Sequence, residues 1–381
     1  MSPSQSGRRR ILPGMPVVVK AGSSSLVLGS GELDPVALQR TVDHVAGMWN
    51  AGHPALLVSS GAVAAGLPAL NLSRKPRDVP GLQVAAAVGQ GLLMERYAAL
   101  FKDRGFVVGQ VLLTKDLFAN RNQYLHARDA LQRMLSSRVV PIVNENDAIV
   151  VDELRLGDND RLAAIVSHLV SAGILVILTD TAGIYTADPK TMDDAELLTA
   201  VHSTDIALDQ LTAGKSGPFG SGGPATKIAA ARMAAWSGIP TVIADAREAD
   251  VVARAVAGDE VGTWVTPHRS KLPARKLWIA FGQPSEGRVM VDPGATRALL
   301  EGGKSLLAVG ISSVQGDFGA DAAVEVAGVD GSLIGKGRVS MTSEQVRLAI
   351  GRHSSEVGGV VIHRDDFVPL AADHSPDRLA T

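Results

Sequence analysis

The chain has 381 residues, of which 46% are hydrophobic and 20% are charged, as in an ordinary soluble globular protein. Its length predicts two domains, one of roughly 250 residues and one of about 100. With 37 basic against 39 acidic residues, the net charge of -2 gives no overall field for nucleic acid or anionic membrane, so a small-molecule function is favoured. No apolar run approaches the ~20 residues of a membrane span. The absence of cysteine excludes disulfides and thiolate chemistry and fits a cytoplasmic protein.

The first two thirds of the chain alternate short apolar runs with helical patterns, which predicts a parallel sheet covered by helices. Residues 1–14 are expected to form a loose tail before the first strand. Asp34 and Pro35 should start a helix that ends near Asn50, since aspartate caps helices and proline suits the first helical position. The expected strands are Val17 to Val19, Ala55 to Val58, Val107 to Leu113, Val139 to Val143, Ile174 to Leu178 and Thr241 to Ala244.

Three turns of small residues are suited to phosphate oxygens, because their backbone amides can approach an anion closely. Lys20 ends the first strand and precedes one of these turns, and Ser60 lies in the second. The third turn closes a segment rich in Gly, Ser and Pro, expected to be a mobile binding loop, and leads into a helix with Lys227 in its first turn. A lysine there opposes the helix dipole, which suggests an anion nearby. The alternative to phosphate binding is that the lysine is solvated and that the small-residue segments are only tight strand-to-helix turns.

Carboxylates and amides gather in two neighbouring segments, Asn144 to Asp147 and Asp158 to Asp160. The first follows a buried strand, and ligands of open α/β sheets bind beyond the carboxyl ends of strands. Asn offers donors and acceptors and Asp accepts from an ammonium group, so the cluster suits a zwitterion such as an amino acid. A polar turn with helix caps is the alternative. Nine histidines are scattered without the spacing of metal ligands, so no protein metal site is predicted.

The pattern changes after Val265, where a polar segment with two prolines, residues 266–273, reads as a linker. The predicted domains are therefore residues 1–265 and 276–370. Beyond the linker, short alternating runs predict a small barrel-like β domain. Its expected strands are Lys276 to Phe281, Arg288 to Asp292, Ala323 to Val329, Leu333 to Val339 and Val360 to His363.

Taken in order, several motifs resemble the amino acid kinase family, and within it the branch that phosphorylates glutamate. The resemblance implies a three-layer kinase domain with a parallel sheet, followed by a small, mostly β PUA domain. The segment from about Lys276 to Val368 resembles that domain, and the matching residues lie between Gly294 and Ile311. It also implies ATP and Mg²⁺, transfer to the γ-carboxylate of L-glutamate as the first step of proline biosynthesis, inhibition by proline, and a homo-oligomer. The motifs begin at Val17, Ser59, Ala86, Val108, Asn144, Gly157 and Gly220.

The resemblance also implies roles for individual residues. Lys20 and Lys227 would flank the transferred phosphoryl group, with Asp158 orienting them. Ser60, Asp147 and Asn159 would hold glutamate, supported by Asn144 and Asp160. Pro224 and Ala225 depart from the family's usual residues, and a proline there should stiffen the loop and start the helix. The residues expected to contact ATP are Lys20, Gly22, Thr179, Asp180, Ser221, Gly222, Gly223, Pro224, Ala225, Thr226 and Lys227.

Other functions remain open from the sequence. A different family member could act on acetylglutamate or a nucleoside monophosphate, although Asp147 suits a free α-amino group. A PUA domain also occurs in RNA-binding proteins, but Lys271 to Leu370 contains 11 basic and 11 acidic residues, so nucleic-acid binding is not expected. A sensor without catalysis would leave Lys20 and Lys227 unexplained.

Overall fold

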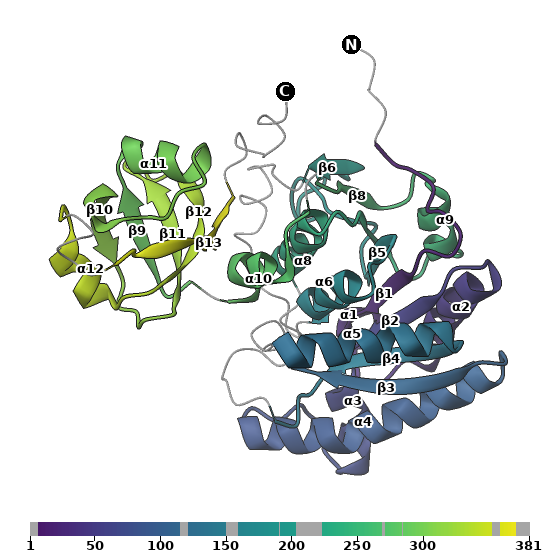
Figure 1. Cartoon of the computed structure of the whole chain (residues 1–381). Helices are drawn as coiled ribbons and strands as arrows, with labels where there is room; N and C mark the ends of the chain where they lie inside the picture. The colour runs from purple at the N-terminus through teal and green to yellow at the C-terminus, as the bar shows by residue number, and fades with distance from the viewer. Residues whose placement is uncertain are drawn as a thin grey trace. The chain divides into compact units, whose positions relative to one another are not determined.

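The computed structural model describes residues 7–114, 121–149, 159–189, 191–202, 223–268, 271–283, 285–352 and 359–370. The chain divides into two compact units, Met1–His268 and Arg269–Thr381 (Figure 1). The boundary falls inside the segment that reads as a linker in the sequence. No helix in these described ranges has the length and apolarity to cross a membrane.

The first unit is built on an eight-stranded sheet with the order β3-β4-β2-β1-β5-β7-β8-β6. Its strands pair in parallel, except that β7 and β8 are antiparallel. All six predicted strands are confirmed, and β1 and β5 are buried along their whole length because helices cover both faces. The strands are β1 (Val17–Ala21), β2 (Ala55–Ser59), β3 (Val107–Leu113), β4 (Val139–Glu145), β5 (Ile174–Thr179), β6 (Ala200–His202), β7 (Thr241–Asp245) and β8 (Thr263–Thr266).

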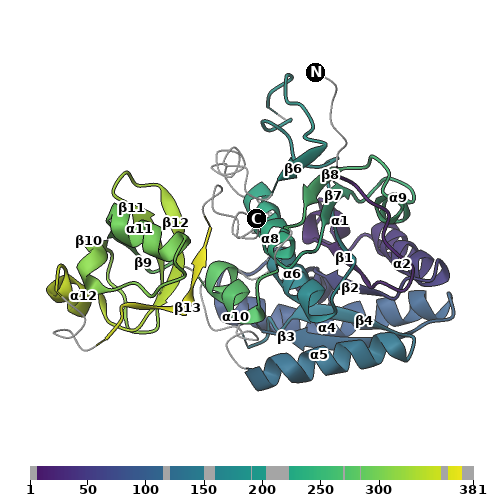
Figure 2. The ribbon, with the colours of Figure 1, turned by 45° about the horizontal axis from the view of Figure 1, so that its top comes forward.

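Helices form a layer on each face of this sheet, as Figures 1 and 2 show. Helices α5, α6 and α8 pack on one face, and α2, α4 and α9 pack on the other, with α3 against α4. The predicted start of α2 is confirmed, since Pro35 is its first residue and the Asp34 side chain accepts a hydrogen bond from the Val36 amide. The helices are α1 (Ser23–Leu26), α2 (Pro35–Asn50), α3 (Ala62–Ala69), α4 (Val79–Lys102), α5 (Arg121–Ser136), α6 (Asn159–Leu169), α8 (Pro224–Trp236) and α9 (Val251–Ala257).

Two glycines let α3 and α4 cross in direct backbone contact. A Cβ on Gly89 would lie 1.8 Å from the carbonyl oxygen of Ala62, and one on Gly66 would lie 2.1 Å from that of Ala85. Both distances are far below van der Waals contact, so no larger residue fits at either position without moving a helix. The close crossing places the middle of α4 beside the carboxyl ends of β2 and β4, where Gln90 and Tyr97 make hydrogen bonds.

Residues 7–14 are docked rather than loose, which corrects the prediction for that part of the expected tail, and residues 1–6 lie outside the described residues. The Arg8 guanidinium donates to four carbonyl oxygens, those of Thr199, Asp259, Val261 and Gly262. The Ile11 side chain is buried and its amide donates to the Val256 carbonyl at 2.9 Å. A single arginine can donate to several backbone carbonyl oxygens at once because it carries five N–H donors in one plane.

The second unit contains a five-stranded sheet with the order β10-β9-β11-β12-β13. Strand β11 pairs in parallel with β9, and the other pairs are antiparallel. Side chains from this sheet and from α11 and α12 form one apolar core that includes Val289, Val324 and Val346. The elements are α10 (Ala274–Leu277), η2 (Trp278–Gly282), β9 (Gly287–Val291), α11 (Pro293–Leu300), η3 (Ala308–Gly310), β10 (Ile311–Gln315), β11 (Ala323–Gly328), β12 (Leu333–Val339), α12 (Ser343–Ala349) and β13 (Ile362–Pro369).

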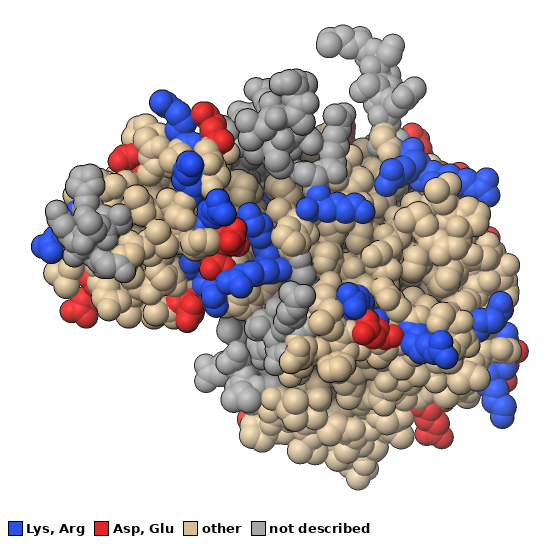
Figure 3. Space-filling view, viewed as in Figure 1, with Lys and Arg blue, Asp and Glu red and all other residues tan. Residues whose placement is uncertain are grey.

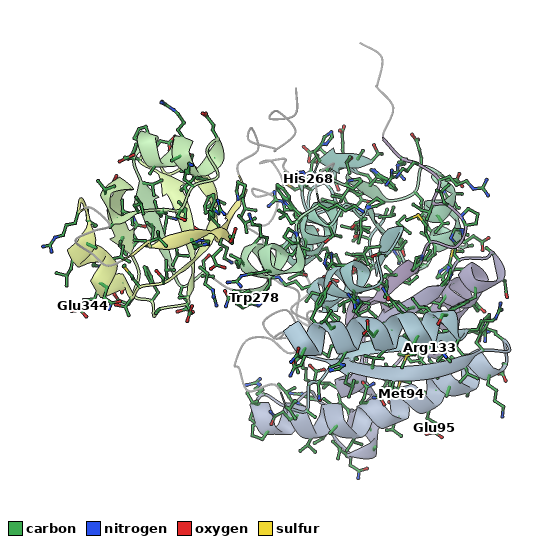
Figure 4. All side chains as sticks on the ribbon, in the orientation of Figure 1. Met94, Glu95, Arg133, His268, Trp278 and Glu344 are labelled. Carbon is green, nitrogen blue, oxygen red and sulfur yellow. The ribbon has the colours of Figure 1, made fainter. Side chains whose placement is uncertain are left out.

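The strand predicted at Lys276 to Phe281 is wrong, because these residues are helical in α10 and the π-helical turn η2, where Figure 4 labels Trp278. Leu277 and Ile279 are buried, and Lys336 donates to the carbonyl oxygens of Ala280 and Gln283. A short apolar run fits a buried helical turn as well as a strand. The predicted last strand also lies too early, since β13 begins at Ile362.

Candidate active site

The residues expected to bind ligands gather at the carboxyl edge of the central strands. Ala21 at the end of β1 pairs with Ser59 of β2 and with Leu178 of β5. The next residue of each strand or loop, Gly22, Ser60 and Thr179, therefore lies at the same edge of the sheet. Helices α6 and α8 begin at Asn159 and Pro224 and pack against each other. Open parallel sheets bind their ligands at this edge.

Asp160 forms a buried charge cluster with two lysines that are far apart in the sequence of the first unit. Its Oδ1 lies 2.5 Å from Nζ of Lys20, and its Oδ2 lies 3.4 Å from Nζ of Lys227. The Thr226 hydroxyl donates to Oδ2 at 2.8 Å. The exposed fractions are 0% for Asp160, 3% for Lys20 and 7% for Lys227. These three side chains carry one net positive charge, which suits an anionic ligand.

The pKa of Asp160 reflects these neighbours. Burial alone would raise it, because a carboxylate loses its hydration. The charges of Lys20 and Lys227, with hydrogen bonds from Lys20 and Thr226, outweigh burial and lower the pKa of Asp160 to about 2. Asp160 therefore stays ionised near neutral pH and holds both ammonium groups in place.

Gly22 gives the Lys20 side chain the space it occupies. A Cβ on Gly22 would lie 2.7 Å from Nζ of Lys20. The ammonium group therefore lies directly over the backbone of Gly22, at the start of the small-residue turn. This contact places the charge of Lys20 beside the turn, as expected for a phosphate-binding loop.

Lys227 lies in the first turns of α8, as predicted. Pro224 is the first residue of the helix, also as expected, and Gly223 precedes it without a side-chain cap. The ammonium group of Lys227 opposes the helix dipole, and Asp160 supplies part of the compensating negative charge. The unfavourable interaction of Lys227 with the helix dipole is therefore partly compensated by a carboxylate of the protein itself.

A second cluster, of amides, lies beside the first. Nδ2 of Asn159 is within hydrogen-bonding distance of the Ser59 carbonyl at 2.7 Å, Ser60 Oγ at 3.1 Å and Asn144 Oδ1 at 2.7 Å. Nδ2 of Asn144 donates to Oε1 of Gln90 at 2.8 Å. Asn159 and Asp160 are consecutive in α6, so the amide and charge clusters share one helix start.

Asp160 makes a contact that was not expected of it, because its carboxylate binds both lysines. The supporting position in the glutamate pocket that the resemblance implied for Asp160 stays a prediction. That contact was expected of Asp158, which lies outside the described residues, as do Ser221 and Gly222. Asp147 lies in the turn after β4 and is half-buried.

No role was predicted for Gln90, although the motif that contains it resembles the family. Gln90 is 8% exposed and lies beside the similarly buried Leu93 and Ala86. A polar residue within a buried helical stretch is the signal that indicates such a position, since buried polar groups need partners. Its partner is 54 residues away, which no local pattern reveals.

Comparison with known proteins places this arrangement in a family. The sequence profile of the amino acid kinase family matches residues 15–245, more than half of the chain. The chain belongs to the amino acid kinase family. The profile of the PUA domain matches residues 287–361, within the second unit.

Relatives within the amino acid kinase family share both units. A glutamate 5-kinase of Frankia casuarinae is 45% identical over 93% of this chain and 96% of its own length. A glutamate 5-kinase of Moorella thermoacetica is 42% identical over 93% of this chain and 96% of its own length. A third glutamate 5-kinase, of Photobacterium profundum, is 39% identical over 97% of this chain and 100% of its own length. A weaker likeness, with 14% identity and a TM-score of 0.47, covers 67% of this chain and 97% of a UMP kinase from Bacillus anthracis.

Proposed function

We propose that this chain transfers the γ-phosphoryl group of ATP to the γ-carboxylate of L-glutamate, forming L-glutamyl 5-phosphate, the first step of proline biosynthesis. The names of its relatives support this assignment over nearly the whole chain. The observation that carries it is the pair of buried lysines held by Asp160. Two converging ammonium groups suit a reaction in which two anions must meet.

The chemistry requires charge compensation rather than a base. A γ-carboxylate has a pKa of about 4.3 and is already ionised near neutral pH, so no residue has to remove a proton. A carboxylate oxygen attacks the γ-phosphorus, the bond to the β,γ-bridging oxygen breaks, and ADP leaves with that electron pair. Lys20 and Lys227 would stabilise the charge on the transferred group and on the leaving oxygen. Asp160 would keep both lysines in position.

The amide cluster would form the glutamate pocket. Ser60, Asn144 and Asn159 lie together there, and Asp147 follows the same strand as Asn144. We assign the substrate ammonium group to this cluster and to Asp147, and we keep Asp158 as a proposed member of the site. The nucleotide would lie along Gly22, Thr179, Asp180 and the start of α8, including residues 221–227.

Magnesium would enter with the nucleotide. In the described residues, no three His, Cys, Asp or Glu side chains group as metal ligands. By the resemblance, the ion would be held chiefly by the ATP phosphates, where Mg²⁺ commonly binds with only one or two carboxylates. Its chemical contribution would be further neutralisation of phosphate charge.

Three further properties belong to the proposal. Proline shares the α-amino and α-carboxylate groups of glutamate, so it should inhibit by competing for the pocket. The chain is proposed to act in the cytoplasm as a homo-oligomer. Nucleic-acid binding is not part of the proposal, because Lys and Arg lie among Asp and Glu on the face of the second unit that Figure 3 shows, and basic residues form ion pairs such as Arg288 with Glu325.

A substrate comparison tests the assignment. ADP formation is measured with glutamate, aspartate, N-acetylglutamate and UMP at equal concentrations of MgATP. Glutamate should be preferred over each of the others by kcat/KM, since one missing methylene or a blocked amino group removes a matched contact. Preference for N-acetylglutamate or UMP would mean that the chain has the activity of a different member of the amino acid kinase family, and it would refute the assignment.

A further inference from the structure

Gln90 of α4 ends a chain of three buried side-chain amides. Its Oε1 accepts from Asn144 Nδ2 at 2.8 Å, and Asn144 Oδ1 accepts from Asn159 Nδ2 at 2.7 Å. The exposed fractions of Gln90, Asn144 and Asn159 are 8%, 1% and 2%. Glycine contacts bring α4 against α3, so a residue far from the other site motifs in sequence reaches the end of β4.

Backbone groups fix the direction of this chain. The Glu145 amide can only donate, and it donates to Oδ1 of Asn144 at 2.9 Å. The Ser59 carbonyl can only accept, and it accepts from Nδ2 of Asn159 at 2.7 Å. The amide of Asn144 therefore points its NH₂ group at Gln90, which must present an oxygen.

The orientation leaves one acceptor for a ligand. Nδ2 of Asn159 has two hydrogens, and the Ser59 carbonyl and Asn144 Oδ1 lie at the two shortest distances from it. Oδ1 of Asn159 is buried and has no hydrogen-bond partner in the part of the chain that the structure describes. A buried acceptor without a partner is costly, so a donor on a ligand gains by binding there. An ammonium group has three donors and no acceptor.

We propose that Gln90 is a positioning residue for substrate selection, and that it acts through Asn144. By accepting from Asn144 it holds the Asn159 amide with Oδ1 available to the α-ammonium group of the substrate. This inference rests on the proposed function. In this proposal Gln90 acts through the hydrogen bond from Asn144 to its Oε1, so its effect should fall on glutamate and not on ATP.

The test replaces Gln90 by Leu, which keeps an apolar fit in α4 but cannot accept a hydrogen bond. The KM for glutamate should rise about fivefold to tenfold, the usual effect of one lost hydrogen bond. The KM for ATP should stay within about twofold. Preference for glutamate over glutarate, which lacks the α-ammonium group, should fall by a similar factor, because Asn144 without the Gln90 acceptor no longer fixes the position of Asn159 Oδ1 beside the α-ammonium group. If Gln90→Leu folds poorly, Gln90→Met serves the same comparison.

Tyr97→Phe is the matched control, since Tyr97 makes a buried hydrogen bond of 2.8 Å from the same helix to Ser59 Oγ. It should cost comparable stability and leave the KM for glutamate and the glutarate preference unchanged. Equal shifts in both variants would show a general packing effect and overturn the proposal.

A double-mutant cycle asks whether Gln90 acts through the amide chain. In an Asn159→Ala background, Gln90→Leu should change glutamate affinity, measured by calorimetry, by less than about twofold. A full additional loss would overturn the proposal. Wild-type activity is measured first. If the wild type does not phosphorylate glutamate, the proposed function fails and this inference fails with it. If the wild type is active and Gln90→Leu has the same KM for glutamate, the inference alone is refuted.

Discussion

The carboxylate of Asp160 lies between the ammonium groups of Lys20 and Lys227, 2.5 Å from the first and 3.4 Å from the second. The two lysines are far apart in sequence and belong to β1 and α8. One buried carboxylate therefore ties the strand that carries the first phosphate turn to the helix that carries the last.

Replacing Asp160 by Asn should impair both turnover and stability. The variant leaves two buried ammonium groups without this carboxylate, at a cost of about 3–5 kcal/mol in unfolding free energy. Because the lysines lose their fixed positions, kcat should fall on the order of 10²-fold. Denaturant unfolding and steady-state kinetics measure the two effects. Asp43→Asn is the control, since it removes a half-exposed ion pair with Arg104 and should change stability by less than about 1 kcal/mol.

The charge cluster also predicts a response to acid. The pKa of Asp160 is lowered to about 2 in the folded chain, below its value near 3.9 in an unfolded one. The folded state therefore gains stability from this group above pH ~4 and loses it as pH falls through about 2. The difference in melting temperature between wild type and Asp160→Asn should be constant from pH 7 to 5 and shrink below pH ~4. A difference that grows in acid would refute this ionisation.

A Gly22→Ala substitution should reduce turnover while sparing the fold. The new Cβ would lie 2.7 Å from Nζ of Lys20, so the flexible lysine must move its charge. We expect kcat to fall about tenfold or more, since small displacements at a phosphoryl-transfer site are costly. Melting temperature should change little. Gly29→Ala is the control, because its Cβ would meet no atom within 4 Å. Equal activity in the two variants would count against the placement of Lys20.

The crossing of α3 and α4 gives a prediction about stability. Gly89→Ala places a Cβ 1.8 Å from the Ala62 carbonyl oxygen, so the helices must separate, and unfolding free energy should fall by roughly 1–3 kcal/mol. Gly91→Ala, two residues on in the same helix, meets no atom within 4 Å and should stabilise by up to about 1 kcal/mol. Thermal unfolding of both variants compares the signs, and a stabilised Gly89→Ala would contradict the close contact.

Much of the first unit could be predicted because most of its predicted strands, such as β1, β2, β5 and β7, are buried along their whole length. Such strands appear as uninterrupted apolar runs, and each predicted run is a strand. Lys20 and Lys227 also stood out, since a lysine at a strand end or at a helix start has a local physical signal. Both lie in the charge cluster.

The partner of the lysines could not be chosen from the sequence. Asp158 and Asp160 flank the same asparagine, and no local pattern in the sequence indicates that the Asp160 side chain binds both Lys20 and Lys227. Gln90 was missed for a similar reason, because its hydrogen bond depends on a helix crossing. The segment at Lys276 was misread because a short apolar run has no distinguishing period.

Trapping the product shows directly whether this chain phosphorylates the γ-carboxylate of glutamate. An acyl phosphate reacts with hydroxylamine to give a hydroxamate, so the enzyme is incubated with MgATP, L-glutamate and hydroxylamine, and the hydroxamate and ADP are quantified together. If the γ-carboxylate is the acceptor, we expect equal amounts of ADP and γ-glutamyl hydroxamate, with neither formed without glutamate. ADP formation that is independent of glutamate, or a hydroxamate at the α-carboxylate, would contradict it.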